Sequence, residues 1–182
     1  MTVVDDEALV RAARKGGSSG EEAFSELIQR HQSKIVRLAG YLLSNFSEAE
    51  DVAQEAFVRA YLALDRLPED ANFEAWMRVI VTRLAYNHRR DSKTRSKYHD
   101  QIEAPRASSD NFAEREALSK VLAELSYPYR EILVLRYVEE MSVKEIADVL
   151  DLGLSATKMR LLRAREQFDA VWQRETNPSP RR

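Results

Sequence analysis

The chain has 182 residues, of which 44% are hydrophobic and 32% charged, a composition typical of a globular protein rather than a disordered one. It contains no cysteine, which excludes disulfides, thiolate metal sites and thiol-based redox sensing. The sequence has no apolar run of membrane-spanning length, and its first residues lack the order of a signal peptide, so we expect a cytoplasmic protein without membrane insertion.

The formal net charge of −2 is unevenly distributed along the chain. Residues 75–97 carry seven Lys or Arg against one Asp, and residues 151–182 carry seven against four Asp or Glu. Acidic residues outnumber basic ones in the rest of the chain. Because nucleic-acid binding depends on a local basic face and not on the total charge, these two segments are candidates for DNA contact.

Apolar residues recur at helical spacing through most of the chain, which predicts an all-α protein. We expect helices at 5–15, 21–31, 33–44, 48–64 and 73–91, and a second group at 113–125, 128–139, 142–150 and 154–173. Between the groups the sequence is polar and loses its periodicity, as interdomain linkers do. We therefore predict two small helical domains joined by a flexible linker, with the divisions 1–92, 93–112, 113–175 and a disordered tail at 176–182.

The expected helix 48–64 has two contrasting faces. Its inward stripe consists of small and apolar side chains: Ala49, Val52, Ala53, Ala56, Phe57, Ala60 and Leu64. The opposite face mixes charged and apolar groups: Asp51, Gln54, Glu55, Val58, Arg59, Tyr61 and Leu62. Apolar groups on an otherwise charged face are typical of a protein-binding surface. The alternative is that Tyr61 and Leu62 only complete the bundle.

The expected helix 73–91 combines a core stripe with a basic face. Its predicted buried residues are Phe73, Trp76, Met77, Ile80 and Leu84. Its outer side carries Arg78, Arg83, Tyr86, Asn87, Arg89 and Arg90, a mixture suited to a DNA backbone and unstacked bases. The polar loop from Leu67 to Asn72 precedes this helix and could form a pocket for a base turned out of the stack.

Residues 142–165 have the pattern of a helix-turn-helix motif. Contacts within the motif are expected from Ile146, Val149, Leu150, Leu154, Leu161 and Leu162. Asp151 stands at the turn, where its side chain tolerates a left-handed backbone. The second helix presents short polar groups and long cations suited to a major groove: Ser155, Ala156, Lys158, Arg160, Arg163 and Arg165. The alternative is a helical hairpin with a solvated basic face.

Catalytic chemistry finds no support in the sequence. His31, His88 and His99 show no metal-ligand spacing with carboxylates, and there is no phosphate-binding glycine loop or nucleophile motif. We therefore expect no enzyme activity, no cofactor, no metal and no small-molecule substrate.

Three segments together resemble the extracytoplasmic-function sigma factors, which form group 4 of the bacterial sigma-70 family. They are residues 48–64, the stretch Phe73-Glu-Ala-Trp76, and residues 129–138 with the helix-turn-helix that follows. Their order and spacing match that family over about residues 20–172. The resemblance implies a transcription-initiation factor that directs core RNA polymerase to promoters, in response to an envelope or stress signal. It also implies that an anti-sigma factor holds the protein inactive.

The resemblance further implies a role for each domain. The first (region 2) would bind the polymerase clamp coiled coil and melt the minus-ten element, and the second (region 4) would read the minus-thirty-five element and meet the polymerase flap. The implied polymerase-binding residues are Asp51, Gln54, Glu55, Val58, Arg59 and Leu62. Those for the minus-ten element are Pro68, Glu69, Asp70, Asn72, Phe73, Trp76, Arg78, Arg83, Tyr86, Asn87 and Arg90. Those for the minus-thirty-five element are Ser155, Ala156, Thr157, Lys158, Arg160, Arg163 and Arg165.

The chain departs from the family pattern at three places. The loop Leu67-Pro-Glu-Asp70 lacks the glycine common in relatives, Arg83 stands where asparagine is frequent, and Ala156-Thr157 replaces a usual threonine-valine pair. The promoter sequence is therefore not predicted. Two other functions stay open on the residues alone: a helix-turn-helix regulator with an N-terminal dimerisation or sensor domain, and a helical scaffold that binds only proteins.

Overall fold

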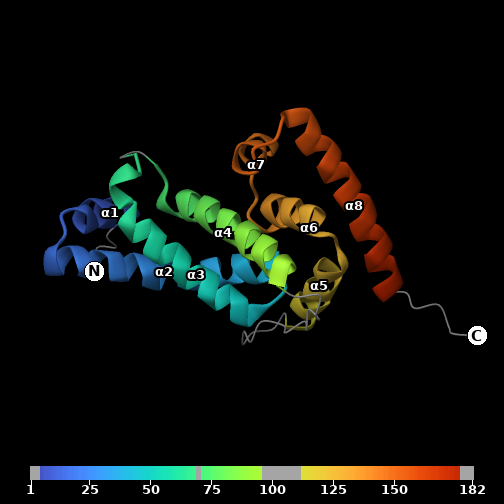
Figure 1. The fold of residues 1–182 in the computed structure, drawn as a ribbon, viewed down its shortest axis with the longest axis horizontal. Helices are drawn as coiled ribbons and strands as arrows, with labels where there is room; N and C mark the ends of the chain where they lie inside the picture. Colours follow the sequence, from blue (N-terminus) through green and yellow to red (C-terminus); the bar gives the residue numbers. More distant parts are fainter. Residues whose placement is uncertain (1–4, 69–70, 96–111, 177–182) are drawn as a thin grey trace, which may run out of the picture. The chain divides into compact units, whose positions relative to one another are not determined.

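The computed structural model describes residues 5–68, 71–95 and 112–176, and these are helical throughout apart from short connections (Figure 1). The helices are α1 (Asp6–Arg14), α2 (Gly17–Leu43), α3 (Phe46–Leu62), α4 (Phe73–Arg95), α5 (Phe112–Glu124), α6 (Tyr127–Leu133), α7 (Val143–Val149) and α8 (Leu154–Thr176). A short 3-10 helix, η1 (Leu64–Arg66), follows α3, and a π-helical turn, η2 (Val134–Val138), follows α6. The all-α prediction is confirmed.

Contacts divide the chain into two compact units. The N-terminal unit comprises residues 1–39 and 47–97, and the C-terminal unit comprises residues 40–46 and 98–182. Most of the predicted linker, and the tail from residue 177, lie outside the described residues. The two-domain organisation expected from the sequence is therefore confirmed, and each unit is described by itself.

Helices α1 and α2 are joined by a tight turn at the start of the N-terminal unit. Asp5 caps α1 by accepting a hydrogen bond from the Ala8 amide at 2.7 Å. Gly16 and Gly17 have φ angles of 67° and 68°, which only glycine adopts without strain. A Cβ atom at Gly20 would lie 3.0 Å from the Ala13 carbonyl oxygen, so this glycine lets the end of α1 approach α2 closely.

Two of the predicted helix boundaries are wrong. The segments 21–31 and 33–44 form the single helix α2, because Gln32 between them is a good helix former and nothing there breaks the backbone pattern. The predicted helix 128–139 is regular only to Leu133 and continues as the π-helical turn η2. The predicted start at residue 128 is close, since Pro128 stands at the beginning of α6.

The core of the N-terminal unit lies between α2, α3 and α4. All seven residues predicted for the inward stripe after residue 48 are buried. In α4 the buried residues include Phe73, Met77, Val81, Leu84 and Ala85, while Trp76 and Ile80 are only half-buried. Leu9, Val10 and Ala13 bury one face of α1, which packs against η1 and the start of α4.

Helix α8 is the centre of the C-terminal unit, where it packs against α5, α6 and α7. The core contains Val121, Leu122, Ile132, Leu135, Ile146, Leu161, Ala164 and Val171. Arg130 lies within this core with 1% of its surface exposed, and its guanidinium donates hydrogen bonds to the carbonyl groups of Leu122, Ala123 and Leu125. These bonds satisfy carbonyl groups at and just beyond the end of α5, and the Leu122 carbonyl also accepts from the Leu125 amide.

Candidate functional site

The outer face of α3 carries large apolar side chains in contact with solvent. Leu62 is 79% exposed, Val58 53% and Tyr61 42%. Asp51, Gln54, Glu55 and Arg59, the polar residues predicted for this face, are also exposed. Glu55 and Arg59 pair with each other at 2.5 Å on the open surface. The exposed face predicted from the sequence is therefore present, with apolar groups among charges.

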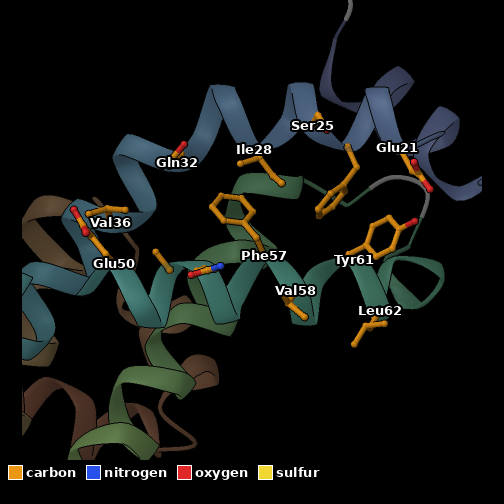
Figure 2. A pocket seen from close by; sticks show the side chains of 13 residues that line it. Glu21, Ser25, Ile28, Gln32, Val36, Glu50, Phe57, Val58, Tyr61 and Leu62 are labelled. Carbon is orange, nitrogen blue, oxygen red and sulfur yellow. The ribbon is translucent and has the colours of Figure 1, made fainter. Parts of the chain in front are cut away.

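A groove of about 860 Å³ lies between α2 and α3 (Figure 2). Phe57 and Tyr61 extend from α3 toward α2, whereas Val58 and Leu62 point away from it. The Phe24 and Tyr61 rings are 5.0 Å apart at one end of the groove. Helix α2 contributes Ile28 and Val36 to the lining of this groove. The sequence did not predict this contribution, because the spacing of these residues fits an ordinary core stripe.

The loop that precedes α4 leads into a well-capped helix start. The Asn72 side chain accepts a hydrogen bond from the Ala75 amide at 2.9 Å, so this residue is the N-cap of α4. Pro68 and Asn72 are exposed, and Glu69 and Asp70 lie outside the described residues. The loop ends predicted for the minus-ten site are thus accessible.

Two residues predicted to contact DNA, Phe73 and Arg78, instead make contacts within the N-terminal unit. Phe73 is only 2% exposed and packs with Phe24, His31 and Trp76, so its ring belongs to the core and the prediction of a DNA contact is corrected. The Arg78 guanidinium is half-buried and hydrogen-bonds the Glu74 carboxylate at 3.2 Å.

The rest of α4 presents the basic face that the sequence predicts. Arg83 and Arg90 are exposed, Tyr86 is 52% exposed, and Asn87 is half-buried at the edge of the same face. An aromatic ring, an amide and cations are therefore brought together on one helix surface. This set can stack on a base and neutralise phosphate groups.

Helices α7 and α8 form the helix-turn-helix. Ser142 and Glu145 make a capping box at the start of α7, with the Ser142 hydroxyl accepting from the Glu145 amide and the Glu145 carboxylate accepting from the Ser142 amide. Asp151 adopts a φ of 52° in the turn, as its position predicts. Ile146 and Leu161 are buried, but Leu154 and Leu162 are 52% and 49% exposed, so the prediction that they pack within the motif is wrong.

The start of α8 exposes most of the predicted groove-reading residues. Ser155, Ala156, Lys158 and Arg163 are exposed, and Arg160 is half-buried. Thr157 is fully buried, and its hydroxyl donates to the Gly153 carbonyl at 3.0 Å. Thr157 therefore supports the helix from beneath, and its prediction as a DNA contact is corrected. The sequence missed Met159, which is 50% exposed on the outer face.

Arg165 lies two turns beyond Lys158 on α8, away from the exposed start of the helix. Its guanidinium lies 5.4 Å from the centre of the Tyr137 ring, a cation–π contact with η2. Both residues line a mostly apolar groove of about 380 Å³ between α5, η2 and α8, together with Leu118, Leu122, Leu133, Val134, Val138, Phe168 and Asp169. Arg165 thus lies at an apolar groove and not among the exposed residues at the start of α8.

Glu131 is a carboxyl group buried beneath the helix-turn-helix, with only 4% of its surface exposed. Burial raises its pKa to about 7, and a hydrogen bond with Tyr127 and the positive charge of Arg160 oppose this shift only in part. Part of the Glu131 population is therefore protonated near neutral pH.

The described parts of the chain show neither a metal-binding cluster nor a membrane-spanning helix. They contain no group of three or more His, Asp or Glu side chains arranged to hold a metal ion. None of the described helices combines the length and the hydropathy that a bilayer crossing requires.

Two family models match the chain in the order that the sequence predicts. Sigma-70 region 2 matches residues 27–95, and sigma-70 region 4 matches residues 115–168. The first match covers most of α2 with α3 and α4, and the second covers the helices packed around α8.

Curated relatives match over nearly their whole length. The chain is 30% identical to the RNA polymerase sigma-H factor of Pseudomonas aeruginosa, with 95% of this chain and 96% of that protein covered. It is 29% identical to the ECF RNA polymerase sigma factor SigW of Bacillus subtilis, with 86% and 91% covered. It is 28% identical to the ECF RNA polymerase sigma-E factor of Escherichia coli, with 90% and 92% covered.

Solved structures have the same fold. The structure of CnrH in complex with the cytosolic domain of CnrY matches with a TM-score of 0.64 and 28% identity, and covers 91% of this chain and 96% of that one. The sigma factor RpoE in complex with the anti-sigma factor NepR from Bartonella quintana matches with a TM-score of 0.67 at 22% identity, which supports the fold alone.

Proposed function

The chain belongs to the extracytoplasmic-function sigma factors of the sigma-70 family, which direct RNA polymerase to promoters. We propose that three exposed surfaces each make one of the contacts that this function requires. One observation favours this function over the regulator and scaffold alternatives: the chain is similar to a whole sigma factor over 95% of its length. We assign region 2 to residues 1–92, the linker to 93–112 and region 4 to 113–175.

The first surface is the outer face of α3, which we assign to the clamp coiled coil of the polymerase. Its support is the exposure of Val58 and Leu62 beside Asp51, Gln54, Glu55 and Arg59. Aliphatic groups at the centre of a polar rim are what a stable helix-to-helix contact requires. A clamp surface that offers aliphatic and basic groups would complement this face.

The second surface is the basic face of α4 with the loop before it, which we assign to the minus-ten element. Arg83, Tyr86, Asn87 and Arg90 supply cations, an aromatic ring and an amide on this face. Such a set suits a displaced single strand, since stacking and phosphate contacts do not require a duplex groove.

The third surface is the start of α8, which we assign to the minus-thirty-five element. Ser155, Ala156, Lys158, Arg160 and Arg163 fit a major groove, and the exposed Met159 adds an apolar contact suited to a thymine methyl group. The separate groove beside Arg165 and Tyr137 is apolar enough to accept the polymerase flap.

We further propose that the protein acts in the cytoplasm as a binding factor and catalyses no reaction itself. An anti-sigma factor is a proposed partner, because the similarly folded sigma factor RpoE has its structure in complex with the anti-sigma factor NepR, and the 28%-identical CnrH has its structure in complex with the cytosolic domain of CnrY. The exposed apolar groove between α2 and α3 is a surface that such an inhibitor could cover.

The function is tested by run-off transcription with purified core polymerase on a genomic library of the host, with and without this protein. Discrete new start sites are expected, and they would supply both promoter elements. Stable DNA binding without any new transcript would instead indicate a regulator.

The clamp assignment is tested by Asp51→Arg and Leu62→Arg in the full chain. Each places a cation on the α3 face and is expected to weaken core binding about a hundredfold. Ser19→Arg adds the same charge at an exposed position of α2 outside the groove and should leave the affinity unchanged. Unchanged core affinity in the folded Leu62→Arg protein would refute the clamp assignment.

The groove-reading assignment is tested by Lys158→Ala and Arg160→Ala in reconstituted transcription. Each is expected to lower promoter use about tenfold, in line with about 1–3 kcal/mol for a good base contact. Lys120→Ala removes a cation from an exposed position of α5 and is the control. A scaffold that binds only proteins predicts no change in any of the three variants.

A further inference from the structure

Helix α8 turns one regular stripe of side chains toward the core of the C-terminal unit. The stripe consists of buried residues spaced three, four or seven positions apart: Thr157, Leu161, Ala164 and Val171. With about 3.6 residues per turn, these positions fall within about 80° of one another around the helix axis. The side of α8 that faces away from the core is therefore defined by the same spacing.

Two large apolar side chains lie on that outer side. Met159 is 50% exposed, and Leu162, three residues further along, is 49% exposed. Both positions lie about 150° around the axis from the middle of the buried stripe, so neither side chain belongs to the core. Residues three apart are neighbours on a helix surface, and the two therefore form one apolar pair that is available to a partner.

Exposed cations flank this apolar pair. Lys158 lies on one side of the pair and Arg163 on the other, each about 70° away around the helix axis. A helix that enters a major groove faces base edges in the middle and has a phosphate backbone on either side. The order of cation, apolar pair and cation across α8 matches that arrangement, which favours DNA over an apolar protein surface as the occupant.

The chemistry of the pair decides which base edge it fits. Leucine offers no hydrogen-bonding group, and the methionine sulfur is only a weak acceptor. Donors and acceptors of a base edge would lose water against these side chains and gain no partner in return. Thymine instead presents an apolar methyl group in the major groove. Because Met159 and Leu162 are about 4.5 Å apart along α8, close to the rise of about 3.4 Å per base pair, they can reach neighbouring base pairs.

We propose that Met159 and Leu162 are specificity-determining residues that read the methyl groups of thymines on neighbouring base pairs of the minus-thirty-five element. Part of the promoter choice would then depend on methyl groups and not on hydrogen bonds. This inference rests on the proposed assignment of the start of α8 to that element. It extends the single apolar contact named there to a pair, and to a requirement for thymine.

The test uses the full chain assembled with core polymerase and a duplex promoter fragment mapped by run-off transcription. Each thymine of the minus-thirty-five element, on either strand, is replaced in turn by uracil, which lacks the methyl group and keeps the same hydrogen-bonding edge. The readout is the ratio of the affinities for the thymine and uracil fragments, which a lower fraction of folded protein does not change. Uracil at neighbouring positions should weaken binding about fourfold each, as expected for one methyl group lost from an apolar contact.

Variants of the pair show whether these side chains sense the methyl group, since uracil can also alter the shape of the duplex. Met159→Ala and Leu162→Ala should each bind the thymine and uracil fragments almost equally at one of the two positions. Met159→Leu keeps an apolar side chain and should retain most of the ratio. Leu154→Ala is the matched control, because it removes an apolar side chain that is 52% exposed but lies about 110° around α8 from the pair. It should retain the parent ratio.

An unchanged affinity at every uracil position would overturn the inference, and so would a uracil penalty that the alanine variants do not remove. A mapped minus-thirty-five element without an A·T pair would overturn it as well. The variants Lys158→Ala and Arg160→Ala separate this failure from that of the assignment. If they lower promoter use while uracil has no effect, only the reading of methyl groups is wrong; if they too have no effect, the assignment of α8 to the element is wrong.

Discussion

An arginine side chain holds backbone carbonyl groups in each unit of the protein, but the two arginines differ in burial. Arg130 of the C-terminal unit is 1% exposed and bonds to carbonyls at the end of α5. Arg14 of the N-terminal unit is half-buried and bonds to the carbonyls of Leu64 and Leu67. The chemistry is the same, and the surroundings decide what each bond contributes.

Because Arg130 is more buried than Arg14, we expect its hydrogen bonds to contribute more to the stability of the fold. Carbonyl groups that lose Arg130 would remain buried and could not find water, so the whole desolvation cost would appear in stability. Leu64 and Leu67 are also buried residues, but their bonds with the half-buried Arg14 are only partly buried, so water can replace the guanidinium in part. Removing Arg14 should therefore cost less stability than removing Arg130.

The largest expected effect is that of Arg130→Ala, which should destabilise the C-terminal unit by about 3–5 kcal/mol. It removes a large buried side chain, together with the guanidinium that donates to the Leu122, Ala123 and Leu125 carbonyls. Amide hydrogen exchange in the full chain would measure the loss in α5, α6 and α8, and exchange in α3 should not change. Arg163→Ala, at an exposed position of α8, is the control.

The same measurement on Arg14→Ala sharpens the comparison. We expect a loss of about 1 kcal/mol in the N-terminal unit, as for an ordinary half-exposed hydrogen bond. If Arg14→Ala lowers the free energy of unfolding as much as Arg130→Ala does, the difference in burial does not decide what each arginine contributes.

Glu131→Gln is expected to remove a pH dependence from the C-terminal unit. Because burial raises the folded-state pKa of Glu131 to about 7, the folded state binds its proton more tightly than the unfolded chain does. The stabilisation is fully present below the unfolded pKa of about 4.3 and is lost as the pH rises through 7, a span of about 4 kcal/mol. The glutamine side chain cannot ionise, so the variant should be more stable than the parent at pH 8 and similar to it at pH 5.

Hydrogen exchange of α6 and α8 at the two pH values, corrected for intrinsic rates, would measure this difference. Glu166→Gln, at an exposed position of α8, should change it by less than about 0.5 kcal/mol. A parent protein whose C-terminal unit is equally stable at both pH values would show that Glu131 is not buried as described.

The sequence predicted most helices because their buried faces repeat strictly, as in α3, where every predicted inward residue is buried. It failed at two boundaries. The predicted break at residue 32 disregarded that Gln32 is a good helix former, and no local residue pattern predicts the π-helical turn that starts at Val134. Arg130 could not be identified as core, because arginine is a surface residue unless its donors all find partners.

The candidate surfaces were predictable as faces but not residue by residue. Helical spacing separates the exposed side of α3 from the buried side, and that prediction held for Val58 and Leu62. The same spacing predicted that Phe73 is buried, so its assignment to DNA came from the family resemblance alone. Thr157 was also assigned to DNA by the resemblance, although it lies one turn before the buried Leu161. The hydrogen bonds of Arg14 in α1 could not be predicted from the sequence, since their carbonyl acceptors lie some fifty residues further along the chain.

Thr157→Val tests the corrected position of Thr157. Valine keeps the shape and removes the hydroxyl, while the Gly153 carbonyl still accepts from the residue 157 amide. We expect a loss of about 0.5–1 kcal/mol in stability and no change in the preferred minus-thirty-five sequence. A changed preference, measured by selection of promoter variants in transcription, would show that Thr157 contacts DNA after all.

The smallest expected effect belongs to Asp151 in the turn between α7 and α8. Its φ of 52° strains a residue with a side chain by about 1 kcal/mol, and its charge lies beyond the carbonyl end of α7, where the helix dipole disfavours it. Asp151→Gly relieves both but gains chain entropy in the unfolded state, so we expect a net stabilisation of about 0.5 kcal/mol. Asp151→Asn removes only the charge, so the difference between the two variants measures the backbone strain less the entropy that glycine gains in the unfolded chain. If glycine is less stable than asparagine, that entropy exceeds the strain, and glycine would give this turn no net stability.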